Sequence, residues 1–110
     1  MAMILVPLPA ENVEAWRAWN QQLTTDKKEE FDDFNKRHQI DRHRVWLTQT
    51  PGGTLAAVLH EGPGADTFMP NLMASDNEFD IWFKESISRF HGIDFSKPPE
   101  GPMPELVLDA

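Results

Sequence analysis

The amino-acid sequence predicts a single α+β domain whose elements follow in the order β-α-β-β-α-β. Two segments with alternating apolar side chains lie on either side of a Pro-Gly-Gly turn, which predicts a β-hairpin. A continuous apolar run precedes this hairpin, and segments with helical spacing of apolar residues lie before and after it. A chain of 110 residues suits one domain with one core, so we assign residues 1–110 to it.

The first three strands are predicted from apolar runs and from alternation. Residues 3–8 (MILVPL) form an uninterrupted apolar run, and the proline within it favours a sheet edge or a strand end. Residues 43–50 and 54–61 alternate in polarity, and residues 51–53 are the predicted loop between them. These two segments form the hairpin.

The helices are predicted from apolar residues at three- and four-residue spacing. Such segments lie at residues 11–23, 27–38, 66–74 and 79–90. Asp26 with Glu29 is typical of a capping box for the second segment, and Ser75 with Glu78 for the last. Gly92 is the predicted left-handed residue that ends the last helix.

A fourth strand completes the predicted sheet. Residues 97–104 are a proline-rich extended connector, and residues 105–109 (ELVLD) are a last short strand. Four strands with helices after the first and third give the split βαβ, or ferredoxin-like, arrangement with a four-stranded antiparallel sheet. Because such crossovers are right-handed, the helices are expected on one face of that sheet.

The uncovered face of this sheet is predicted to be apolar. Trp46, Ala56 and Val58 are expected to share it, and the first strand is apolar on both sides. A monomer rarely exposes a patch of this kind. We therefore expect a homodimer in which two sheets pack face to face about a two-fold axis.

Three stretches of the chain carry a resemblance to a known superfamily: RVWLTQTPGGTLAAVLHEG, SDNEFDIWFKESISRFHGID and PPEGPMPELVLD. With the element order, they resemble the dimeric α+β barrel superfamily, which includes antibiotic-biosynthesis-type monooxygenases, EthD-like proteins and stress-responsive barrel proteins. More narrowly, the chain is similar from residue 3 to residue 109 to a group of small bacterial proteins of this barrel type. The resemblance implies the fold and the dimer. It implies no single reaction, because the superfamily hosts many chemistries and the Asn-Trp-His set of the monooxygenases has no match here.

Composition excludes several classes of function. Ten Lys and Arg against eighteen Asp and Glu give a formal net charge of −8, which argues against nucleic acid or an anionic membrane as a partner. The absence of cysteine excludes disulfides, thiol nucleophiles and Cys–Zn sites. No apolar run has the length of a membrane span, so we expect a cytoplasmic protein. No flavin, nicotinamide or phosphate-loop signature is present, and we expect no cofactor, although a single histidine leaves haem open.

His60 is the candidate catalytic residue. If residues 51–53 are the loop, Arg44 and Trp46 lie near His60 on the face that forms the cavity between subunits. There His60 could act as a base or a hydrogen-bond donor, with a pKa lowered by burial; Arg44 could clamp a carboxylate, and Trp46 could line the cavity. The alternatives are a strand-end histidine bonded to solvent or to Glu61, an arginine paired with an acidic neighbour, and a tryptophan that only fills the interior.

The segment at residues 66–74 supplies the other predicted ligand contacts. Phe68 and Met73, with Met69, are adaptable side chains that suit a lid over a variable ligand. We expect this lid to cover the same cavity as His60.

The remaining histidines favour structural interpretations. His38, Asp41 and His43 have ligand-like spacing only if their segment is helical, and no fourth ligand is evident, so no metal site is predicted. His91 gains dipole energy at a helix end, and Asp94 suits the turn that follows.

Three functions stay open on the sequence. The first is a small homodimeric barrel that binds a modest, partly apolar organic molecule, with cofactor-free chemistry of the monooxygenase or isomerase kind. The second is a non-enzymatic ligand-binding or stress-related protein that uses the same cavity without turnover. The third is an acidic interaction module that docks a basic partner through Glu29, Glu30, Asp32 and Asp33, although a charged run on a helix is usually a solvated face.

Overall fold

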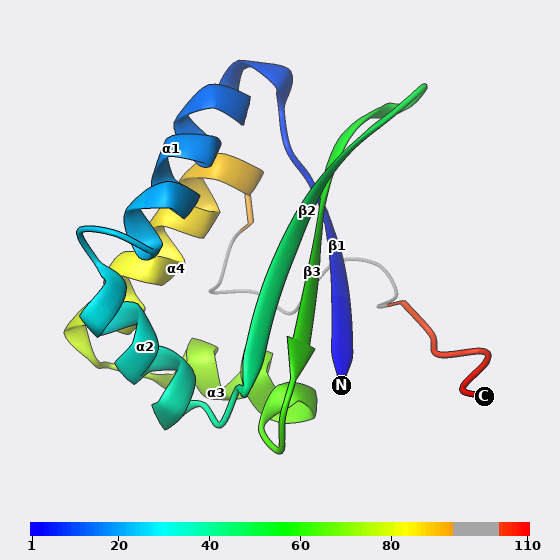
Figure 1. Ribbon diagram of the computed structural model, residues 1–110. Coiled ribbons are helices and arrows are strands. Elements are labelled where there is room, and N and C mark those ends of the chain that lie inside the picture. Colours follow the sequence, from blue (N-terminus) through cyan, green and yellow to red (C-terminus); the bar gives the residue numbers. More distant parts are fainter. Residues whose placement is uncertain (94–103) are drawn as a thin grey trace.

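A three-stranded antiparallel sheet carries the helices of the chain on one of its faces (Figure 1). The structure is a computed structural model that describes residues 1–93 and 104–110. Its strands and helices confirm the α+β class predicted from the sequence.

The sheet consists of β1 (Ala2–Pro7), β2 (Arg42–Thr50) and β3 (Gly53–Glu61) in the order β1-β3-β2. Because β3 pairs antiparallel with both neighbours, β1 and β2 run parallel to each other at the two edges. Side chains in β1 alternate in exposure, with Ile4 and Val6 half-buried and Met3 and Leu5 exposed. The apolar run of β1 therefore divides between the helix-covered face and an open face.

The hairpin turn sets which residues share a face. Thr50 pairs with Gly53, so the turn contains only Pro51 and Gly52. Gly53 has a φ of 131°, which is accessible to glycine and lets it begin the strand. The predicted three-residue loop is thus one residue too long, and such a slip reverses the face of every side chain in one strand relative to the other.

The prediction that Trp46 shares a face with Ala56 and Val58 is therefore wrong. Trp46 lies opposite Ala57, whereas Val58 lies opposite Val45 on the helix-covered face. The open face instead carries Trp46 with Met3, Leu5, Leu55, Ala57 and Leu59, as the register of the strands requires.

The helices are α1 (Val13–Leu23), α2 (Lys28–Arg37), α3 (Phe68–Ala74) and α4 (Glu78–His91), with 3-10 turns η1 (Ala10–Asn12) and η2 (Ala65–Thr67) before α1 and α3. The predicted helical segments are confirmed to within a few residues at their ends. α1 and α4 lie beside each other across the sheet, and α3 lies at one end of it (Figure 1).

Phe34 of α2 is the centre of the core. Its side chain is fully buried. Its ring packs at 4.6 Å from Phe83 and 5.7 Å from Phe68 between ring centroids, so it contacts both α4 and α3. This aromatic packing fixes the helices against the inner face of the sheet.

The caps of the helices differ in part from the prediction. Asn77 is the N-cap of α4, and its side chain accepts a hydrogen bond from the backbone N–H of Phe79 (2.9 Å). The predicted Ser75 capping box is wrong because α4 begins after Asn77; the Ser75 hydroxyl accepts from the backbone N–H of Asn77 (3.3 Å) and donates to Asp80. Asp26 does not cap α2 either. The N-cap of α2 is Lys27, whose side chain makes no hydrogen bond to the first turn of the helix. Gly92 ends α4 in the left-handed conformation with φ 70°, as predicted.

Substitution of Asn77 tests the cap. Asn77→Ala removes the acceptor for a helix N–H that has no partner within the helix, so the free energy of unfolding should fall by about 1 kcal/mol. Asp76→Ala, at the exposed preceding position, is the matched control and should change it by less than about 0.5 kcal/mol. Urea unfolding of both variants gives the comparison, and equal midpoints would contradict the cap.

The predicted fourth strand does not form. Residues 104–110 belong to no strand or helix, and Leu106, Val107 and Leu108 are 65%, 85% and 79% exposed. These side chains are not buried against the described part of the chain, so no packing supports a strand there. The connector predicted at residues 97–104 falls outside the described residues except for Pro104.

No helix in the described part of the chain is long and apolar enough to span a bilayer.

Candidate functional site

A cavity of about 270 Å³ lies between the inner face of the sheet and the helices. The sheet contributes apolar side chains of all three strands together with two histidines, and the four helices contribute mostly aromatic and aliphatic groups. The principal lining residues are Ile4, Val45, Val58, Trp16, Trp19, Phe31, Phe68, Met69, Phe83, Ile87, His43 and His60. None of the lining residues carries a Lys, Arg, Asp or Glu side chain. The cavity is therefore suited to an uncharged apolar molecule.

His43 and His60 face each other across the hairpin inside this cavity. They are direct partners in the register of β2 and β3, and their ring centroids are 4.4 Å apart. The two Nε2 atoms are 3.2 Å apart, and His43 Nδ1 lies 3.1 Å from Oδ1 of Asn35 on α2. Nδ1 of His60 is buried and has no hydrogen-bond partner among the described residues. Asn35, His43 and His60 thus form a row of hydrogen-bonding groups in otherwise apolar surroundings, and Nδ1 of His60 is the group at its end that has no partner in the described part of the chain.

Burial sets the charge of this pair. Desolvation lowers the pKa of His60 to about 4. Desolvation, with the neighbouring His60, lowers the pKa of His43 to about 3. Both imidazoles are therefore neutral at pH 7, which agrees with the expectation for His60. A neutral imidazole has one donor and one acceptor nitrogen.

Arg44 and Trp46 lie outside the cavity. The two-residue turn places both on the open face of the sheet, where Trp46 is 45% exposed. The Arg44 guanidinium forms an ion pair with Glu61 and stacks over the Trp46 ring at 5.4 Å from its centroid. The structure therefore does not bring either residue to His60, and the alternative interpretation of Arg44 as an arginine paired with an acidic neighbour matches its contacts.

The predicted lid is only partly at the cavity. Phe68 is buried there, and its ring lies 4.3 Å from that of His60 between centroids. Met69 also lines the cavity. Met73 is not among the residues that line it; its backbone carbonyl accepts a hydrogen bond from Lys84 of α4 (3.3 Å). Phe68 and His60 thus lie together as predicted, but in a cavity inside the monomer rather than between subunits, and Met73 does not line it.

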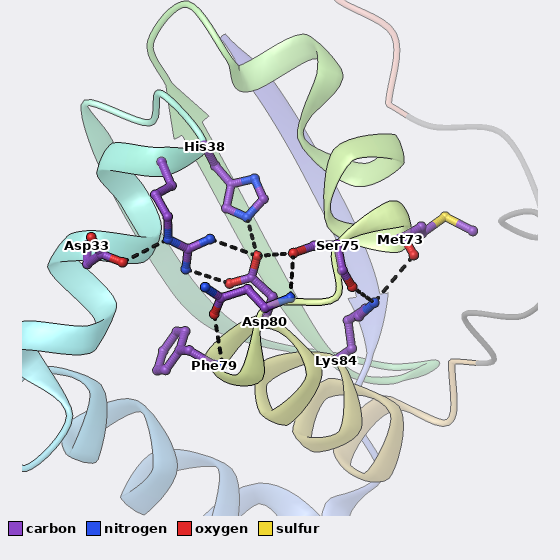
Figure 2. A network of polar contacts seen from close by, with 9 residues as sticks. Asp33, His38, Met73, Ser75, Phe79, Asp80 and Lys84 are labelled. Carbon is purple, nitrogen blue, oxygen red and sulfur yellow. Dashed lines mark hydrogen bonds and ion pairs between the residues drawn. The ribbon is translucent and has the colours of Figure 1, made fainter.

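A second polar group, which we call the Asp80 cluster, consists of Arg37, His38, Ser75 and Asp80 (Figure 2). Asp80 is fully buried on α4. Its carboxylate accepts two hydrogen bonds from the Arg37 guanidinium (2.8 and 3.0 Å), one from His38 Nε2 (2.9 Å) and one from the Ser75 hydroxyl (2.6 Å). The cluster therefore ties α2 and the α3–α4 connection to α4.

The charges of this cluster are balanced inside it. Burial alone would raise the pKa of Asp80, but the hydrogen bonds from Arg37, Ser75 and His38 outweigh burial and lower that pKa to about 2. The hydrogen bond to Asp80 raises the pKa of Arg37 above its usual range. Ser75 and His38 both donate to the carboxylate rather than to each other. This arrangement lacks the hydroxyl-to-histidine bond that activates a serine, so its role is structural.

The other histidine of interest is also held structurally. Nδ1 of His91 donates to the backbone carbonyl of Pro7 (2.8 Å), which joins the end of α4 to the end of β1. Asp94 falls outside the described residues.

Within residues 1–93 and 104–110, no group of three or more His, Asp or Glu side chains is placed to hold a metal ion.

Sequence reasoning missed His43 as the partner of His60 and Asp80 as a buried anion. The spacing of His43 from His38 points only to a metal ligand, yet its alternation with Val45 places it on the inner face once the turn is two residues long. Asp80 had a weaker signal: it is an acidic residue in the first turn of an amphipathic helix, where a dipole role is the ordinary expectation.

No protein-family model, curated protein or solved structure matches this chain.

Proposed function

We propose that this protein binds a small, uncharged, largely apolar organic molecule in the cavity between its sheet and its helices. The observation that carries the proposal is an apolar cavity of about 270 Å³ with two buried polar atoms on its lining residues that have no partner among the described residues, Nδ1 of His60 and Nε1 of Trp19. Apolar surroundings with a few placed polar groups are typical of small-molecule sites. Buried polar atoms without a partner cost free energy that a ligand can recover.

Binding without turnover is favoured over catalysis by the state of the histidines. A general base works best with a pKa near the working pH, whereas burial lowers the pKa of His60 to about 4. Cofactor-free chemistry of the monooxygenase or isomerase kind would require the substrate to supply its own reactivity. Oxygen consumption with any ligand that binds is the assay that separates turnover from binding.

The acidic interaction module is disfavoured by the ion pairs of α2. Asp32 pairs with Lys28 (2.6 Å) and Asp33 with Arg37 (2.8 Å) along the helix. Glu30 also lies 3.6 Å from Lys27, so three of the four acidic residues have a cation beside them, which weakens the attraction of a basic partner.

Two adjacent alanines of β3 provide the test of the cavity. Ala56 lines the cavity, whereas Ala57 lies on the open face. Ala56→Leu should fill the site and abolish the thermal stabilisation produced by a two-ring hydrocarbon such as indene, and Ala57→Leu should leave that stabilisation intact. Circular dichroism establishes that both variants fold. Equal stabilisation of the two variants, or none in the unmodified protein, would refute the proposed function.

We also propose that two copies pair through their open sheet faces, in the manner of the dimeric α+β barrels that the sequence resembles. The exposed fractions of Met3, Leu5 and Trp46 are 43%, 49% and 45%, and all three lie on this face. Sheets that pack in this way bury one apolar face of each. The exposed apolar residues 106–108 would then have a second copy as a neighbouring surface.

A single charge on the open face should separate the two copies. Light scattering is expected to give about twice the chain mass of 12.6 kDa for the unmodified protein, and Leu5→Arg should shift it to the monomer. Ile81→Arg is the matched control, because Ile81 is similarly exposed (40%) but lies on α4. A monomer in the unmodified protein would contradict the dimer.

A further inference from the structure

We infer that the ligand of this cavity carries an N–H or O–H group that donates a hydrogen bond to Nδ1 of His60, which serves as an acceptor. The ligand class is thus a neutral, largely apolar molecule of one or two rings with one such donor. This inference rests on the proposed function and adds the group by which the site recognises its ligand.

The direction of the hydrogen bonds follows from Asn35. Its Oδ1 lies 3.1 Å from His43 Nδ1, and a carbonyl oxygen can only accept, so His43 carries its proton on Nδ1. A neutral His43 then has a bare Nε2. His60 must place its own proton on Nε2 to donate across the 3.2 Å between the two rings. The remaining nitrogen of a neutral His60, Nδ1, is therefore a bare acceptor.

The neutral state of both rings is supported by their surroundings. Desolvation keeps the pKa of each histidine well below 7, and no acidic residue lines the cavity to stabilise an imidazolium. His60 is 1% exposed, so solvent outside the cavity does not reach Nδ1. An unsatisfied acceptor of this kind is the group that a donor on a ligand would satisfy.

Charge and size limit the ligand further. A charged ligand would be desolvated without a counter-ion, because no lining residue is a Lys, Arg, Asp or Glu and both His43 and His60 are neutral. An engineered cavity of about 150 Å³ binds benzene. The cavity here, at about 270 Å³, therefore has room for a two-ring molecule.

Three probes of nearly the same shape separate the donor from the apolar body. Indole offers an N–H donor, benzofuran replaces it with a ring oxygen, and indene replaces it with a methylene group. Calorimetry should show that indole binds about tenfold more tightly than the other two, which is the effect of one hydrogen bond to a buried group. In His60→Phe this preference should disappear, while binding of indene persists.

Each outcome has a distinct meaning. Equal affinity for the three probes would leave the proposed cavity function standing and overturn the inference about the donor. Tighter binding of benzofuran than of indole would show that the site offers the ligand a donor, from Nδ1 of His60 or Nε1 of Trp19, rather than an acceptor, which also overturns it. No binding of any probe would refute the proposed function and the inference together.

Nitrogen NMR of the unmodified protein tests the same point without a substitution. At pH 7, the imidazole ¹⁵N shifts should show a protonated Nε2 and a bare Nδ1 for His60, and the opposite tautomer for His43. A proton on Nδ1 of His60 would overturn the inference, even if His60→Phe fails to fold.

Discussion

Replacement of Asp80 by alanine is expected to lower the free energy of unfolding by about 3–5 kcal/mol. The carboxylate is fully buried and accepts hydrogen bonds from Arg37, His38 and Ser75. Without it, the buried His38 Nε2 and the Ser75 hydroxyl lose their acceptor, and α4 loses its link to α2. Urea denaturation followed by circular dichroism measures the change.

Asp33 offers a matched control for this substitution. It pairs with the same arginine at 2.8 Å, but its side chain is 63% exposed. Asp33→Ala should therefore change stability by less than about 1 kcal/mol. If Asp80→Ala and Asp33→Ala have similar effects, the Asp80 cluster does not hold the helices together.

Acidification below pH 6.5 is expected to destabilise the protein well before its carboxylates titrate. The unfolded chain binds protons at its histidines near pH 6.5, whereas the folded chain does not protonate His60 until about pH 4 and His43 until about pH 3. Between these values the unfolded state holds more protons, so stability falls as the pH falls. The loss through His60 alone is of the order of 3 kcal/mol across this window.

Other groups act in different pH ranges or weakly. The pKa of His91 is also lowered by burial, so it adds to the loss in the same direction. The pKa of Asp80 is about 2, and its stabilising effect is lost only as the pH falls below about 4, toward that value. The net charge of −8 diminishes on acidification and relieves repulsion, which opposes the loss.

The comparison with His60→Phe isolates the histidine from these effects. The free energy of unfolding, obtained from urea denaturation between about pH 7.5 and about pH 4.5, should fall less steeply with pH for the variant. The difference in slope should correspond to the uptake of close to one proton on unfolding. Parallel curves for the two proteins would show that His60 titrates normally in the folded state.

The helices and the hairpin could be predicted from the sequence because their signals are local. Apolar spacing in α1 and α4 and the alternation of β2 and β3 each fall within one element. The faces of the hairpin could not be fixed in this way, because they depend on whether Gly53 belongs to the turn or to the strand. Because Gly53 belongs to the strand, the register differs by one residue from the predicted one. His43 therefore lies beside His60 on the inner face, and Trp46 lies on the open face.

Contacts between distant residues account for the other differences. Ser75 has the sequence of a cap, but α4 begins two residues later, where Asn77 accepts from the N–H of Phe79, and the Ser75 hydroxyl is left to donate to Asp80. Residues 105–109 contain a short apolar run of the kind found in strands, yet a strand needs a neighbouring edge and a surface to cover it. Neither requirement can be read from the segment itself.

The position of a bound ligand tests the central claim most directly. Adjacent residues of β1 and β3 point to opposite faces of the sheet, so Ile4 and Val58 face the cavity while Leu5 and Leu59 face outward. With methyl-labelled protein and indene, nuclear Overhauser effects should connect the ligand protons to the methyl groups of Ile4 and Val58. Contacts to Leu5 and Leu59 in place of these would contradict the proposed site.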